Sequence, residues 1–198
     1  ALIHFFVGSI EVSIPVLAAS LSDSLSGSTY SPSILIGFFQ GAFGFGAFIV
    51  SFLLSHIPFC GRELTFLFGS ICSASLMLIF IPAVSSILPL ARFFYIVMFF
   101  VLGGSIIIAG NAYRTIIQRS TPSQYLGRVF AISGSIGNGS FPFSMLIYGF
   151  LFENNPFQPV LIYTGLALLV STVLSFILLI GVQHGNRGRK TSSITEEA

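Results

Sequence analysis

One carboxylate in this sequence stands near the middle of a long apolar stretch, and it is the first residue whose type could do chemistry. Glu11 lies within residues 1–20. A charged side chain at the centre of a membrane costs about 3 kcal/mol unless it is protonated, paired or in contact with water. A carboxyl group held there could exchange a proton while a cationic substrate binds. Pro15, four residues later, removes a main-chain hydrogen bond and bends a helix. We therefore predict a coupling site at Glu11; the alternative is that Glu11 lies near a membrane interface.

Three amide side chains are further candidates for binding. Gln40, Asn111 and Asn138 are lone amides in or beside apolar stretches. Each could line a cavity, or each could form a hydrogen bond between two helices, which in a membrane contributes about 1 kcal/mol. Phenylalanines surround Gln40, and a minority of them could form an aromatic wall for a hydrophobic ligand while the rest face lipid or the core. This group consists of Phe38, Phe39, Phe43, Phe45 and Phe48.

Arginines gather in the stretch RTIIQRSTPSQYLGRVF, residues 114–130, between two apolar segments. In the simplest interpretation Arg114, Arg119 and Arg128 anchor a loop at the membrane surface. In the other interpretation they pair with acidic groups elsewhere in the protein and hold one conformation, which would make them parts of a switch. Arg62, in the segment HIPFCGRE (56–63), is a weaker candidate for the same role.

The composition indicates which elements must position these residues. Charged residues make up 7% of the chain and hydrophobic residues 54%, with a mean hydropathy of +0.96, whereas about 25% of residues are charged in a soluble domain. A membrane-spanning helix needs about 20 mostly apolar residues, and barrel strands would instead give alternating segments of about ten. The sequence therefore predicts an all-α membrane protein, with a six-span bundle over residues 1–182 and a disordered tail, 183–198. The expected transmembrane helices are 1–20, 33–55, 64–82, 91–112, 129–150 and 159–182.

Basic residues predict the orientation, because short cytoplasmic loops are rich in Lys and Arg. If 56–63, 113–128 and the tail are cytoplasmic, seven of the eight Lys and Arg residues lie on that side and only Arg92 lies opposite. Six helices then place both ends of this chain in the cytoplasm of a multi-pass cell-membrane protein. The RGRK of the tail could contact anionic membrane lipid, but the acidic residues that follow favour a solvated tail.

Two glycine-rich segments suggest an internal repeat. GAFGFG (41–46) and GSIGNG (134–139) both read G-x-x-G-x-G, and each lies in the second helix of a set of three. Transporters are often built from repeated helix triplets, so the match predicts a 3+3 repeat. The alternative is chance, because small residues are common where membrane helices pack together.

The stretch NAYRTIIQRSTPSQYLGRVFAISGSIGNGSFPFSMLIYG (111–149) resembles a segment of drug-efflux permeases of the major facilitator superfamily, particularly the macrolide-efflux-like branch. In those permeases this segment joins the tenth and eleventh helices. The matching positions are Asn111, Thr115–Gln118, Pro122 and Gly127–Phe130. The segment 56–63 departs from the family: only Gly61 and Arg62 match the loop motif G-x-x-x-D-R-x-G-R-R, and the acidic residue before the arginine is absent. A gating role for that segment is therefore in doubt.

The resemblance covers essentially the whole chain, as the C-terminal six-helix half of a twelve-helix facilitator fold. It implies a missing N-terminal six-helix half, and we expect a fragment because the chain begins at Ala1 inside an apolar stretch. It also implies a secondary transporter that exports small hydrophobic or amphipathic compounds of the multidrug or macrolide type by alternating access, as a proton antiporter. The alternative from another class is a six-span structural or assembly protein without transport.

Residues suited to enzyme chemistry or to cofactor binding are few. His4, His56 and His184 lie near the ends of the expected spans or outside them, and no G-x-S-x-G pattern is present. Cys60 and Cys72 are too few for a structural zinc site and have no His or Cys neighbour at ligand spacing. We therefore expect no enzyme activity, no cofactor, no metal and no nucleic-acid partner.

Overall fold

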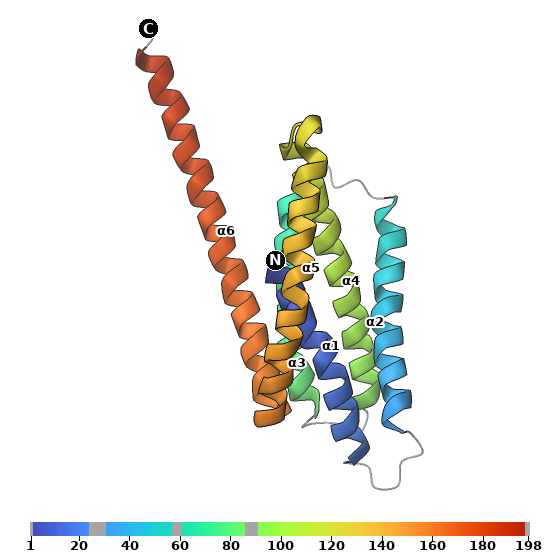
Figure 1. The fold of residues 1–198 in the computed structure, drawn as a ribbon. Coiled ribbons are helices and arrows are strands. Elements are labelled where there is room, and N and C mark those ends of the chain that lie inside the picture. Colours follow the sequence, from blue (N-terminus) through green and yellow to red (C-terminus); the bar gives the residue numbers. More distant parts are fainter. Residues whose placement is uncertain (1, 24–30, 57–60, 86–90, 197–198) are drawn as a thin grey trace.

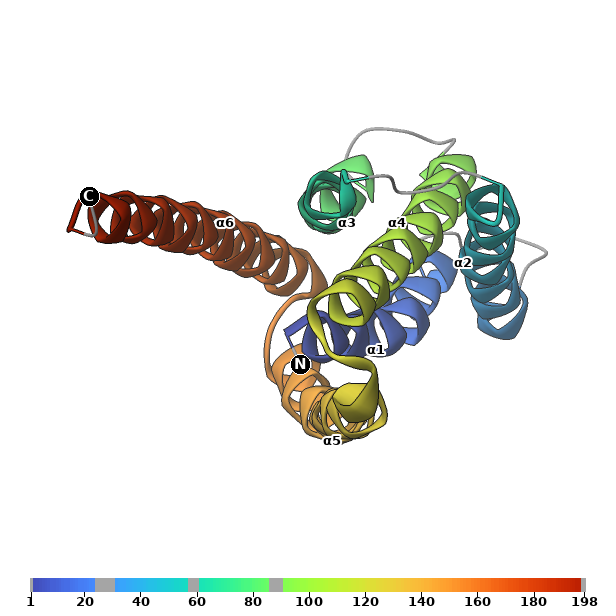
Figure 2. The ribbon, with the colours of Figure 1, turned by 90° about the horizontal axis from the view of Figure 1, so that it is seen from above.

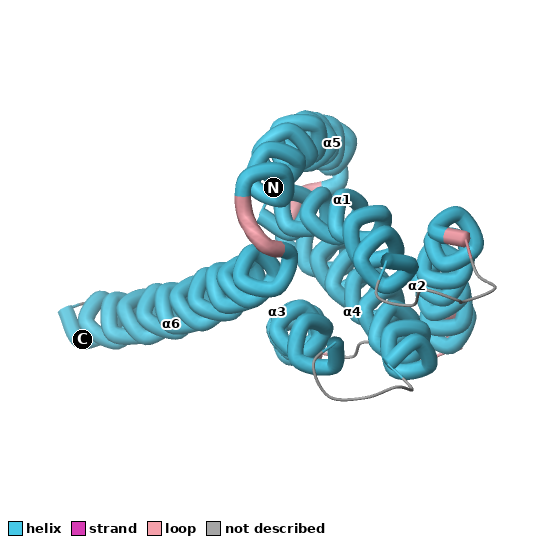
Figure 3. Tube along the Cα trace, turned by 90° about the horizontal axis from the view of Figure 1, so that it is seen from below, coloured by secondary structure: helices cyan, strands magenta, loops and turns pink. Residues whose placement is uncertain are grey.

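The computed structural model describes residues 2–23, 31–56, 61–85 and 91–196, and this part of the chain is helical apart from short turns (Figure 3). The prediction of six helices is confirmed. Their bounds are α1 Leu2–Asp23, α2 Pro32–Leu54, α3 Glu63–Ser85, α4 Ala91–Ser120, α5 Ser123–Asn154 and α6 Phe157–Glu196.

Five of these helices are long and apolar enough to cross a membrane. They are α1, α2, α3, α4 and α6, and their candidate spans are His4–Ser22, Pro32–Leu54, Glu63–Val84, Phe93–Ser120 and Phe157–Leu179. The expected span at 129–150 lies in α5, which is 32 residues long but is not among the five helices with a stretch apolar enough to cross a membrane. The difference comes from the glycines, serines and Asn138 in the first half of α5, which lower its hydropathy without shortening it.

The arginine-rich stretch 114–130 is not a loop, which corrects the expectation from the sequence. α4 continues to Ser120 and α5 begins at Ser123, so only two residues separate them. The break falls at Thr121 and Pro122 because proline disfavours a helical conformation for the residue before it and has no N–H to continue the helix. Arg114 and Arg119 therefore lie on the last turns of α4, and Arg128 lies on the second turn of α5.

The end of α6 also differs from the expected bounds. Apolar residues stop near residue 182, where the sequence placed the end of the last span, but the helix continues to Glu196. Adding residues to an existing helix requires no new nucleation step, so α6 continues although Gly185 and Gly188 are poor helix formers. Figure 1 shows the resulting long helix leaning away from the rest of the bundle.

Consecutive helices run in opposite directions, so α2 and α4 lie parallel to each other, as do α1 and α5 (Figure 1). α1 lies between α5 and α2, and α4 lies between α3 and α2, as Figure 2 shows from above. α6 packs mainly against α3. The core contains Tyr95 and Phe99 of α4 with Phe39 of α2, whose ring stacks on Phe99 at a centroid distance of 5.3 Å. The candidate aromatic wall thus loses Phe39 to the core, while Phe38, Phe45 and Phe48 are exposed.

Glycines allow the tightest approach, which is between α2 and α4. A Cβ on Gly46 would overlap the main-chain carbonyl of Phe100, and a Cβ on Gly103 would overlap that of Phe43. Gly46 is the last residue of the G-x-x-G-x-G segment in α2. Close backbone contact of this kind is how small residues drive association of membrane helices, since lipid provides no hydrophobic driving force between them.

Candidate functional site

Glu11 lies near the middle of α1, as the sequence predicted. α1 runs from Leu2 to Asp23, and the Glu11 side chain is half-buried. Ser9 and Ser13 on either side donate their hydroxyls to the carbonyls of Phe6 and Ile10, at 2.6 and 2.8 Å. Both serine hydroxyls therefore donate within α1, and neither donates to the Glu11 carboxylate. The structure shows no cation or hydrogen-bond donor on the Glu11 carboxylate within the described residues, and Pro15 follows without ending the helix.

The three amides do not converge on Glu11 as one cluster. Gln40 is exposed on α2, Asn138 is exposed on α5, and Asn111 is half-buried near the end of α4. Across the described parts of these helices, no hydrogen bond joins any of the three side chains to another helix. The interpretation as interhelical hydrogen bonds therefore finds no support in this bundle. Gln40 and Asn138 instead face outward from the helices on the two sides of α1.

Arg119 forms an ion pair with a carboxylate of the same bundle. Its guanidinium Nη1 donates to Oε1 of Glu63, the first residue of α3. The same oxygen accepts the main-chain N–H of Gly61 at 3.1 Å. Gly61 has a φ of +77°, a conformation that side chains other than glycine rarely adopt. The pair joins the start of α3 to the end of α4, and each charge is favourable for the dipole of its own helix.

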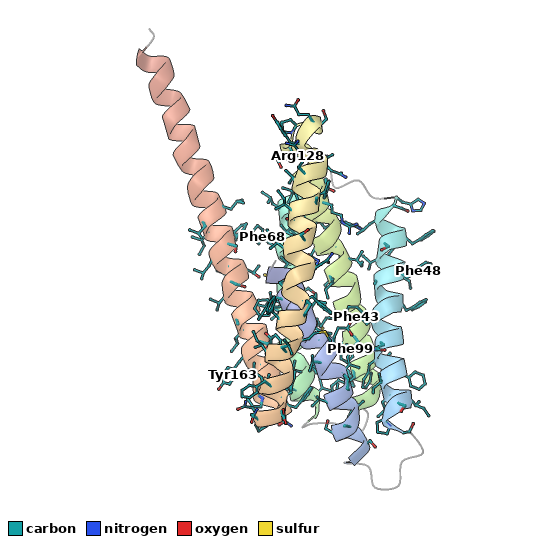
Figure 4. All side chains as sticks on the ribbon, in the orientation of Figure 1. Phe43, Phe48, Phe68, Phe99, Arg128 and Tyr163 are labelled. Atoms are coloured by element: carbon teal, nitrogen blue, oxygen red, sulfur yellow. The ribbon has the colours of Figure 1, made fainter. Side chains whose placement is uncertain are left out.

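The other arginines at this end of the bundle are placed differently. Arg62 and Arg128 are exposed, and Figure 4 shows Arg128 near the upper end of α5. Arg114 lies one and a half turns before Arg119 on α4 and lines a polar cavity between α2 and α4. Arg119–Glu63 is the one ion pair found in the part of the chain that the structure describes.

The interior of the bundle holds too little space for a substrate. A cavity between α1, α3, α4 and α6, lined by Phe6, Ile10, Ser105 and Leu168 among others, has a volume of about 20 Å³. Pockets for small molecules have volumes of about 300 to 1,000 Å³. This cavity is therefore too small to hold a compound.

Glu63 was not among the residues singled out from the sequence. One signal was available, because Glu63 is the acidic residue directly after Gly61 and Arg62, in the segment that matched the loop motif poorly. Its partner, Arg119, is 56 positions later in the chain. The pairing needs the contact between α3 and α4, which no local pattern specifies. Cys60 lies outside the described residues, and Cys72 is a free, half-buried thiol.

Comparison with known protein families gives one match. The family described as transmembrane secretion effector, of the major facilitator type, matches residues 3–193. No curated protein and no solved structure matches the chain. The matched range includes every candidate residue above and all six helices except Leu2 and residues 194–196.

Proposed function

The chain belongs to the transmembrane secretion effector family of major facilitator permeases and is therefore a multi-pass membrane transporter by family; from this premise we propose that it exports small hydrophobic or amphipathic compounds by alternating access. The proposed activity is drug or macrolide efflux coupled to proton entry across the cell membrane. The observation that carries the proposal is Glu11, a half-buried carboxylate without a cation partner in the described residues, in the middle of an apolar helix.

The substrate path in this proposal lies between this bundle and a second six-helix unit. The interior cavity of about 20 Å³ is too small for a compound, which favours a path beside the bundle. Gln40 and Asn138, on exposed faces of α2 and α5, would then line the path with Glu11, and Asn111 would lie near one end of it. These six helices alone would not transport.

The helix contacts support the proposed 3+3 repeat. If α1, α2 and α3 correspond to α4, α5 and α6, a contact of α2 with α4 corresponds to a contact of α5 with α1. Both contacts are extensive in this bundle, and α3 packs on α6, which is the same contact under the exchange. Facilitator halves built as inverted triplets have this symmetry.

The basic residues support the proposed orientation. Arg62, Arg114, Arg119 and Arg128 all lie at the end of the bundle that carries the α2–α3 and α4–α5 connections, the upper end in Figure 1. By the positive-inside rule this end is cytoplasmic. Exposed Arg62 and Arg128 are free to pair with acidic groups of the second unit in one conformation of the transport cycle, whereas Arg119 already pairs with Glu63.

The test is proton-driven efflux in vesicles that contain the natural protein. Replacing Glu11→Gln keeps the shape of the side chain and removes its charge, so we expect substrate accumulation driven by a pH gradient to fall to the level of protein-free vesicles. Glu153→Gln is the matched control, because Glu153 is an exposed carboxylate at the C-terminal end of α5 and not in the middle of a span.

Equal accumulation by the Glu11→Gln and Glu153→Gln variants would show that Glu11 does not couple transport to protons. No gradient-driven flux even with the unaltered protein, for a panel of hydrophobic cations and macrolides, would favour the alternative of a structural or assembly protein.

A further inference from the structure

A polar cavity lies between the last turns of α2 and α4, apart from Glu11 and from the interior of the bundle. Its volume is about 310 Å³, at the lower end of the range for small-ligand pockets. The polar side chains that line it are Ser51, Ser55, Asn111, Arg114, Thr115 and Gln118.

Most hydrogen-bond donors of this cavity are gathered on one face of α4, and Ser51 adds one from α2. Ser55 and Thr115 already donate their hydroxyls to the carbonyls of Phe52 and Asn111, at 2.6 and 2.9 Å. The groups left to donate are the Arg114 guanidinium, the amides of Asn111 and Gln118, and the Ser51 hydroxyl. Asn111, Arg114 and Gln118 are spaced three and four residues apart, which places them on the same side of the helix. Such a set of donors around one cation suits an anion.

Arg114 carries the uncompensated charge. Glu63, at the start of α3, is bound to Arg119. No acidic residue lines the cavity. An anion that enters it would therefore meet one guanidinium and no opposing carboxylate, and charge-assisted hydrogen bonds to such a group are about twice as strong as neutral ones.

The depth of the cavity identifies the source of the anion. The candidate span of α2 ends at Leu54, and Ser51 and Ser55 lie on either side of that point. Phe48, one turn closer to the membrane centre, points outward from α2 with 66% of its surface exposed (Figure 4). The α2 side of the cavity thus lies at the end of a candidate span, where lipid headgroups are expected, and the α4 side lies near the end of the span that stops at Ser120.

We propose that this cavity binds the phosphate group of an anionic membrane phospholipid, with Arg114 as its cation and Asn111, Gln118 and Ser51 as neutral donors. The inference requires only that the bundle lies in a membrane, and it does not depend on transport.

The experiment is native mass spectrometry of the full protein released from mixed vesicles of phosphatidylglycerol and phosphatidylcholine. The unaltered protein is expected to retain phosphatidylglycerol in preference to phosphatidylcholine. Arg114→Gln should lower this preference about fivefold, the effect of one basic residue near an anionic surface. Arg128→Gln is the matched control and should leave the preference unchanged, because Arg128 is exposed near the upper end of α5.

A second variant and added inorganic phosphate test the proposed site further. Gln118→Leu removes a neutral donor and should lower the preference less than Arg114→Gln, which gives a second readout if the arginine variant does not fold. Equal losses for Arg114→Gln and Arg128→Gln would show a general surface charge and overturn the site. Retention of added inorganic phosphate without any lipid preference would overturn the headgroup as its source. If the protein retains neither phosphatidylglycerol in preference nor inorganic phosphate, the phosphate assignment is overturned, and Arg114 would instead pair with a carboxylate of another segment.

Discussion

α2 carries glycines on two faces, and the two faces have opposite environments. On the inner face Gly46 lies so close to α4 that a single added carbon would overlap the carbonyl of Phe100. On the outer face, no atom of another helix lies within 4 Å of the position where a Cβ would stand on Gly37, Gly41 or Gly44. The same residue type is thus essential to packing on one side and unexplained by packing on the other.

The outer glycines make sense if another structure packs against them. Glycine in a helix costs about 1 kcal/mol relative to alanine, so three of them on an open face weaken α2 without any gain within this bundle. Residues 37, 41, 44 and 48 follow the spacing of one helix face. We interpret this face, defined by Gly37, Gly41, Gly44 and Phe48, as the contact surface for the second six-helix unit.

The largest effect is expected on the inner face. Gly46→Leu would force the backbones of α2 and α4 apart, and we expect it to destabilise the bundle by about 3 kcal/mol, at the upper end for overpacked cores. Thermal unfolding followed by size-exclusion chromatography measures the loss. Gly69→Leu on α3 is the control, since a Cβ on Gly69 also meets nothing within 4 Å. Equal unfolding temperatures for the two variants would refute the tight contact.

A change on the outer face should separate folding from transport. Gly41→Leu adds a side chain in open space, so the bundle is expected to fold as well as the unaltered protein. If the second unit packs on this face, the variant loses most of its substrate flux because the helices can no longer approach. Gly69→Leu serves again as the control and should keep its flux. Full activity of Gly41→Leu would show that the second unit does not pack on the outer face of α2.

The smallest effect is expected where an inner glycine meets a side chain and not the main chain of the other helix. A Cβ on Gly104 would lie 2.8 Å from Cγ2 of Val50 and 3.7 Å from the carbonyl oxygen of Gly46. Val50 can shift, and alanine is a better helix former than glycine by about 1 kcal/mol, so the two contributions nearly cancel. We expect Gly104→Ala to change stability by less than about 1 kcal/mol in the same unfolding assay. A loss as large as that of Gly46→Leu would show that α2 and α4 tolerate no adjustment.

Some of this fold follows from hydropathy alone, because a membrane helix needs a long apolar stretch and little else. The existence of all six helices was predictable for this reason. The extent of α4 and α5 was not, because the helix propensity of residues 113–130 outweighs their polarity and only Pro122 interrupts them. The polar residues of α5 also lower its hydropathy, so its length in the structure exceeds what its apolar content indicates.

The candidate site was less predictable than the fold. Glu11 was recognisable because a carboxylate in an apolar stretch is rare. The pairing of Arg119 with Glu63 and the cavity at Arg114 depend on which helices lie side by side, and a single sequence does not contain that information. The two roles of glycine in α2 are hidden for the same reason, since Gly44 and Gly46 stand two residues apart in one motif.

The most direct test of the central claim, that the outer face of α2 contacts a second six-helix unit, is photo-crosslinking from Phe48. Replacing Phe48 with benzoylphenylalanine puts a reactive group of similar size on that face, and the same replacement of Phe80 puts one on α3, where 49% of the side-chain surface is exposed. In native membranes the account predicts protein crosslinks from position 48, to a segment outside residues 1–198, and lipid crosslinks from position 80. Lipid crosslinks from both positions would contradict it.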